Sequence, residues 1–185
     1  MSVWGALAGG FAGTLVLTIA LAAANQLHLT RMDIPFLLGT AWTEDRSRAR
    51  VIGYAVHFVF GLLFSLAYYA AFLALGRAGW ALGAVFGLLH ALFAGTTLVN
   101  LLLPVVHPRM GTAMSAADSA PLLEAPGFLL LNYGRATPTV TILALAYGGI
   151  VEVFTGALQA NAAARRLDQR GCIAHAYTIR RMYIV

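Results

Sequence analysis

The sequence predicts an all-α membrane protein whose fold is a four-helix transmembrane bundle. Four windows, residues 1–30, 51–76, 78–108 and 136–164, contain no Lys, Arg or Asp, and Glu152 is their single carboxylate. Each window is longer than the roughly 20 apolar residues that a helix needs to cross a bilayer. The chain is 60% hydrophobic and only 10% charged, whereas soluble domains carry about a quarter charged residues.

The spans are expected near the centres of these windows, at about residues 4–27, 51–75, 79–103 and 138–160. They form one domain, residues 1–164, followed by a basic C-terminal tail at 165–185, which we expect to continue the last helix as far as Gly171. The first window has no basic n-region, and its apolar run exceeds the 7–15 residues of a signal peptide, so we interpret it as a retained span.

The connections between the spans differ in length. Spans two and three are joined only by residues 76–79, which predicts an antiparallel hairpin. The other two connections are long, and each contains an apolar patch, Phe36–Leu38 in one and Phe128–Leu131 in the other. We interpret these patches as short re-entrant or amphipathic pieces in the membrane interface.

The two halves of the chain echo each other. Aligning Phe60-Gly61 with Tyr147-Gly148 brings His57 onto Ala144 and Ser65 onto Glu152. Trp4 and Trp80 open equivalent spans, and Asn25 and Asn100 lie near their ends. The pattern predicts two degenerate helix-loop-helix repeats that face the same way in the membrane.

Charge and cysteine content restrict the partners. The net charge of +5 comes from arginines that flank the apolar windows, which favours contact with anionic lipid over nucleic acid. Cys172 is the only cysteine and excludes an internal disulfide or a CxxC redox pair. Six arginines fall on each side of the membrane, so the positive-inside rule gives no orientation.

Each span carries a stripe of small or polar residues that predicts its buried face. Ionisable residues within spans are costly and mark candidate sites. We expect His90 and Glu152 to lie at similar depth and to pair, with His57 towards the opposite face. The pair could hold two spans together, handle a proton or cation, or coordinate a metal or ligand. The predicted ligand or ion site comprises His57, His90, Glu152, Asn100 and Thr97.

Cofactor and enzyme chemistry have no motif here. His57 and His90 differ in depth by roughly 9 Å along the membrane normal, which disfavours a bis-histidine haem. His28 and His107 near the span ends are metal candidates together with Asp33, although they lack the spacing of a metal-binding motif. GxSxG, P-loop and Cys/His-cluster sequences are absent, which argues against an enzyme.

Several loop phrases resemble a group of small four-span bacterial membrane proteins whose activity is unknown. These phrases are Asp33–Thr40, Arg46–Arg50, Gly76–Trp80, His107–Met110, and Pro126-Gly127-Phe128 running to Asn132–Arg135. Members of the group often carry a histidine where this chain has Ala144. The resemblance implies a bacterial inner-membrane address and a four-span architecture, but no activity.

The sequence leads us to expect a membrane protein that binds or transports a small ligand, an ion or a proton at an intramembrane polar site. Two other hypotheses remain: a structural or accessory subunit, or an assembly factor, of a larger membrane complex, and a haem- or metal-bearing electron carrier. The expected partners are the lipid bilayer and either a second copy of the chain or a larger complex.

Overall fold

The computed structural model describes residues 2–77, 79–107 and 127–156, and every regular element in these ranges is a helix. The last helix, Ala136–Gly156, is called the fourth span below. The other elements are α1 (Val3–Gln26), α2 (Ile34–Thr40), α3 (Arg46–Leu75), α4 (Trp80–Leu92), the π-helix η1 (Phe93–Leu102) and α5 (Leu103–Val106).

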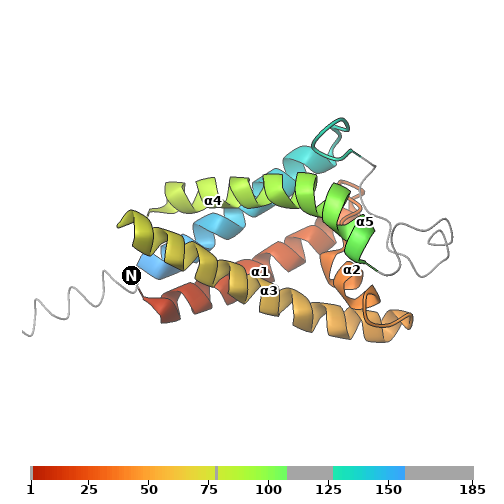
Figure 1. Ribbon diagram of the computed structural model, residues 1–185, viewed down its shortest axis with the longest axis horizontal. Coiled ribbons are helices and arrows are strands. Elements are labelled where there is room, and N and C mark those ends of the chain that lie inside the picture. Colours follow the sequence, from red (N-terminus) through yellow and green to blue (C-terminus); the bar gives the residue numbers. More distant parts are fainter. Residues whose placement is uncertain (1, 78, 108–126, 157–185) are drawn as a thin grey trace, which may run out of the picture.

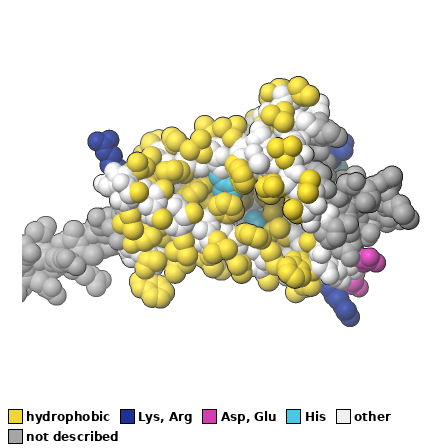
Figure 2. Space-filling view, viewed as in Figure 1, with side chains coloured by type: hydrophobic (Ala, Val, Ile, Leu, Met, Phe, Trp, Pro, Cys, Tyr) yellow, Lys and Arg dark blue, Asp and Glu magenta, His cyan; other side chains and the backbone are white. Residues whose placement is uncertain are grey.

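The four predicted spans are confirmed as helices long and apolar enough to cross a membrane. They are α1, α3, the continuous Trp80–Leu102 segment and the fourth span. Figure 1 shows them running along the long axis of the molecule, with α2 and α5 at one end. In Figure 2 the described charged side chains lie at the two ends, and hydrophobic side chains cover the middle. The all-α bundle is therefore the fold predicted from the sequence.

The second span begins earlier than predicted. Residue 51 was the expected start, but α3 begins at Arg46 behind an N-cap at Asp45, whose side chain accepts the Arg48 N–H. The reason is that arginines are good helix formers, and the helix continues beyond the apolar window. At 30 residues, α3 is about 45 Å long. The predicted end of the fourth span and the C-terminal tail lie outside the described residues.

The α3–α4 connection is the short hairpin that the sequence predicts. Gly76 ends α3 with φ 62°, a left-handed conformation that glycine adopts without strain. Gly79 is the N-cap of α4. A Cβ added at either glycine would meet no atom within 4 Å, so neither glycine is packed against a helix at its Cβ position.

The first apolar patch, Phe36–Leu38, forms part of α2. This helix packs on α3. Asp33 caps its N-terminus by accepting the Phe36 N–H at 3.1 Å. A Cβ on Gly39 would collide with the Ala49 backbone, and a Cβ on Gly53 would collide with the Pro35 carbonyl. The two backbones are therefore in direct contact, and α2 is fixed to the first turns of α3.

Small residues also mark the main helix crossings. Between α1 and α3, Gly10 lies against Ser65 and Gly61 against Thr14. Between α4 and the fourth span, two glycines of α4 meet the backbone of Gly148 and Ala144; these glycines are Gly83 and Gly87. Helices in lipid associate through such close packing, so the predicted small-residue stripes are the contact faces of these crossings.

The third span is not a uniform α-helix. It changes to the π-helix η1 at Phe93 and returns to the α conformation at Leu103. In η1 the Asn100 side-chain amide donates to the Gly95 and Thr96 carbonyls, at 2.7 and 3.0 Å. These bonds satisfy carbonyl groups in the altered segment, where hydrogen bonds run from i to i+5.

The Gly53 contact gives the first prediction. Gly53→Ala adds a methyl group where the Pro35 carbonyl lies, and we expect it to lower the free energy of unfolding by about 1–3 kcal/mol. The measurement is unfolding in detergent micelles. Gly149→Ala is the matched control, because a Cβ there meets nothing within 4 Å, so it should leave stability equal or raise it by up to about 1 kcal/mol. Equal losses in both variants would contradict the close contact.

The Asp45 cap gives a pH-dependent prediction. Its carboxylate accepts the Arg48 N–H at 2.7 Å and the Ser47 hydroxyl at 2.5 Å, and these bonds lower the Asp45 pKa below its usual value of 3.8. The stabilisation is therefore complete above pH 3.8 and disappears as the pH falls through the lowered pKa. We expect Asp45→Ala to destabilise the bundle at pH 7 and to match the wild type in strong acid. Urea titrations at several pH values measure this difference.

Candidate functional site

A cleft opens between α1, α3 and the segment that leads into α2. It has a volume of about 290 Å³ and carries polar side chains from all three segments. Its lining residues are Thr18, Leu21, Ala22, Asn25, Gln26, Met32, Asp33, Ile34, Pro35, Arg50 and Tyr54. The cleft therefore lies towards the α2 end of the bundle, where α1 ends and α3 begins.

His57 is not one of the lining residues, but its position on α3 places it near two of them. It follows Tyr54, a lining residue, by three positions, so the two share a face of α3. On α1, Gly10 faces Ser65 and Thr14 faces Gly61. Continuing that antiparallel register by one turn places Thr18, another lining residue, opposite His57.

One nitrogen of the His57 imidazole has no hydrogen-bond partner among the described residues. The His57 side chain is only 6% exposed, and this nitrogen is its Nε2 atom. A buried polar atom without a partner costs about 1–3 kcal/mol, and native structures retain few of them. A buried, unpaired nitrogen next to a cleft is the feature expected of a group that meets a ligand.

Two charged residues line the outer part of the cleft. Asp33 and Arg50 both belong to its lining. Because Asp33 also caps α2, its position is fixed by backbone hydrogen bonding. The cleft thus offers a carboxylate and a guanidinium, and the His57 imidazole lies about one helical turn beyond Tyr54 on α3.

His90 belongs to a different environment, an aromatic cluster. Its Nδ1 atom lies 3.1 Å from the Tyr68 hydroxyl, which also bonds the Phe86 carbonyl at 3.1 Å. Its ring packs on Phe64 with centroids 4.1 Å apart, and lies 6.1 Å from the Tyr147 ring. His57 precedes Phe64 and Tyr68 on α3 by about 10 and 16 Å of axial rise. The two histidines therefore do not share a site.

The expected pair between His90 and Glu152 is not formed. Glu152 is buried beside Gly83, near the start of α4, and its Oε1 atom is directed towards Gly156. Gly83 precedes His90 by about 10 Å along α4. In the part of the chain that the structure describes, the hydrogen bond of His90 goes to Tyr68 instead. The prediction was wrong because it took depth from span midpoints, whereas the glycine contacts set the register.

Asn100 and Thr97, the other predicted site residues, lie on η1. Asn100 donates to the Phe128 carbonyl at 3.0 Å, and its Oδ1 accepts the Gly127 N–H at 2.9 Å. Its side chain thus fastens the turn before the fourth span, and Phe128 packs there with Met32, Ala136 and Val140. Thr97 contacts Thr96 through their hydroxyls at 3.5 Å. Neither residue faces the cleft.

The two interfacial histidines are not brought together as a metal site. The His107 Nε2 atom lies 3.0 Å from the Leu37 carbonyl and 3.3 Å from the Thr40 hydroxyl, so it joins α5 to α2. His28 instead lines a second pocket with two arginines. The described residues contain no group of three or more His, Cys, Asp or Glu placed to hold a metal ion.

The cleft residues that were not among the predicted site residues include Asn25, Arg50 and Tyr54. Arg50, Tyr54 and His57 are spaced as i, i+4 and i+7, which is one face of a helix. That signal was present in the sequence, but it requires a helix that starts before Arg50. Because Arg50 is charged, we placed it in the loop before the second span.

Comparisons with protein-family models, with curated proteins and with solved structures found no match for this chain. Function is therefore inferred from the chemistry of the cleft alone.

The two buried histidines should respond differently to replacement by leucine. His57→Leu removes an unpaired polar atom, so stability should remain equal or rise by about 1 kcal/mol. His90→Leu removes the Tyr68 hydrogen bond and the Phe64 ring contact, so stability should fall by about 1 kcal/mol or more. Thermal unfolding of both variants in the same detergent tests this contrast. A loss in His57→Leu as large as that in His90→Leu would mean that His57 has a partner.

Proposed function

We propose that the protein binds or transports a small ligand, an ion or a proton through the cleft between α1 and α3, with His57 as the intramembrane contact. The observation that carries this proposal is the buried Nε2 atom, which has no hydrogen-bond partner among the described residues. Polar groups inside a membrane are costly and are usually paired or functional. This nitrogen has no structural bond to account for it.

The size and chemistry of the cleft restrict the ligand. Its volume of about 290 Å³ is at the lower limit of ligand pockets, which span about 300–1,000 Å³, and this favours a small solute or an ion. Histidine exchanges protons near neutral pH more readily than any other side chain. Asp33 at the outer part of the cleft attracts cations, so a proton is the first ligand to test.

We also infer two helix-pair repeats in a bacterial inner membrane. In the repeat alignment Gly61 matches Gly148 and Ser65 matches Glu152. Both matched pairs contact the first helix of their own half: Ser65 and Gly61 lie against α1, and Glu152 and Gly148 against α4. The halves differ at the site, because Ala144 takes the position of His57. The proposed site therefore belongs to the first half alone.

Proton flux into liposomes tests the function. Purified protein is reconstituted in vesicles that contain a pH-sensitive dye, and a potassium diffusion potential drives protons inwards. We expect the wild type to acidify the lumen and His57→Gln to abolish this flux. Asp33→Asn should slow it, because the carboxylate lines the proposed cleft.

His28→Gln is the matched control. This substitution also removes one imidazole, but His28 lines a different pocket. It should leave the flux unchanged. An unaltered flux in His57→Gln would refute the role of the cleft in proton movement. A wild-type protein without flux that co-purifies in mild detergent with a stable partner complex would instead support an accessory subunit.

A further inference from the structure

A second pocket lies where α1 ends and the fourth span begins. It has a volume of about 370 Å³ and is lined by the segment that follows α1 and by the turn that precedes the fourth span. The lining residues are His28, Leu29, Thr30, Arg31, Phe128, Asn132, Tyr133, Gly134, Arg135 and Ala136. Nothing in the proposed function uses this pocket.

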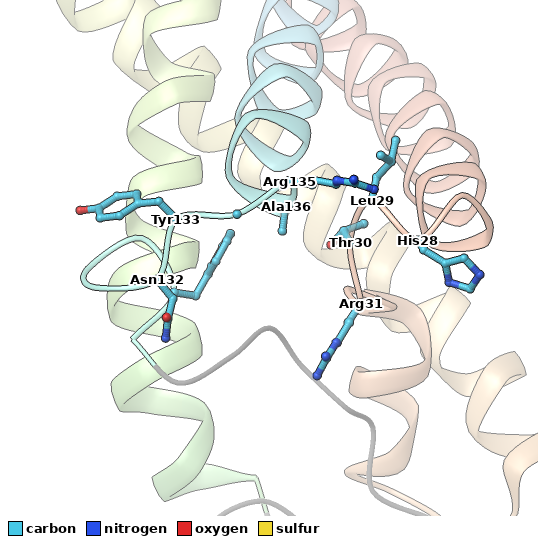
Figure 3. Close-up of a pocket in the computed structure, with 10 residues that line it drawn as sticks. His28, Leu29, Thr30, Arg31, Asn132, Tyr133, Arg135 and Ala136 are labelled. Atoms are coloured by element: carbon cyan, nitrogen blue, oxygen red, sulfur yellow. The ribbon is translucent and has the colours of Figure 1, made fainter.

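The charge of this pocket differs from that of the cleft. Arg31 and Arg135 both line it, and none of its ten lining residues is acidic. Figure 3 shows the Arg135 side chain extending towards Leu29, with Arg31 at the opposite edge. The α1/α3 cleft, by contrast, balances Arg50 with Asp33. A concave site whose described lining carries two guanidinium groups and no carboxylate favours an anion.

The backbone adds to this preference. Ala136 lines the pocket and is also the first residue of the fourth span, a helix of 21 residues. The N-terminus of a helix carries a partial positive charge and has N–H groups without intrahelical partners. The pocket thus combines a helix N-terminus with two arginine side chains.

The position of the pocket indicates the kind of anion. It lies at the ends of two apolar spans, where lipid head groups are expected. Exposed aromatic residues that are typical of membrane interfaces occur at this end of the bundle, with Trp42 72% and Tyr133 70% exposed. Guanidinium groups bind phosphate oxygens through two parallel hydrogen bonds.

We infer that this pocket binds a phosphate-bearing anion, and that Arg31 and Arg135 supply its charge contacts. Phosphate could come from an anionic lipid head group or from a free phosphate in the aqueous phase. Both sources present the same oxygens to the same side chains, so the experiment has an arm for each.

Gly134 allows a sharp test. A Cβ at this lining position meets nothing within 4 Å, so a side chain fits there without disturbing the fold. Gly134→Asp adds a carboxylate to the pocket and should repel the anion, whereas Gly134→Asn adds nearly the same volume without charge and should not. Arg31→Gln combined with Arg135→Gln removes the proposed contacts. Arg48→Gln is the matched charge control, because Arg48 is exposed at the same end of the bundle but lies outside the pocket.

The lipid arm uses the full chain in nanodiscs of equal parts phosphatidylethanolamine and phosphatidylglycerol, with retained lipid counted by native mass spectrometry. The free-anion arm titrates inorganic phosphate against the protein in a neutral detergent. We expect the wild type to retain phosphatidylglycerol or to bind phosphate. Gly134→Asp and the double arginine variant should weaken that binding about tenfold, which corresponds to about 1.4 kcal/mol.

If these variants lose binding only in the lipid arm, the pocket is assigned to a lipid head group. If they lose binding in the phosphate arm, it is assigned to a free anion. Either result supports the proposal. A wild type that binds neither probe overturns it. Equal weakening by Arg48→Gln, or by Gly134→Asn, also overturns it, because the attraction would then come from general surface charge or from the shape of the segment.

Discussion

The structure depends on close backbone contact between helices at positions without bulky side chains. Lipid is as apolar as leucine, so burial of hydrophobic surface does not drive these helices together, and packing must do so. Gly53 against Pro35, Gly10 against Ser65 and Gly83 against Gly148 are contacts of this kind. They fix the register of each crossing, and the register decides which polar side chains meet. The cleft between α1 and α3 lies beyond these contacts, towards α2.

The two halves of the bundle use similar residues in different ways. Asn25 lines the open cleft of the first half. Asn100, near the end of the corresponding span, forms side-chain hydrogen bonds with the backbone of the Gly127–Phe128 turn. His90 is likewise held by Tyr68 within aromatic rings. The side chains of Asn100 and His90 are thus hydrogen-bonded, whereas the His57 Nε2 atom has no hydrogen-bond partner among the described residues.

The composition of the sequence predicted the four spans, but the register between neighbouring helices was not predicted. Windows free of charge located all four spans, because charged groups are excluded from a bilayer core. The early start of α3 was missed, since arginines at 46–50 were treated as a loop although Asp45 caps a helix there. The Glu152–His90 pair failed because Glu152 contacts α4 at Gly83, about two helical turns before His90. The partner of Asn100 lies 28 residues away, and no local pattern identifies such a partner.

Gly76 and Gly79 in the α3–α4 connection show how little the connection contributes to joining the two helix pairs. The two helix pairs recognise each other through contacts elsewhere, such as the Tyr147 hydroxyl on the Gly61 carbonyl at 2.6 Å and Tyr68 on His90. The connection itself contributes no packing at its glycines. The contacts that join the two helix pairs therefore do not depend on side-chain packing at Gly76 or Gly79.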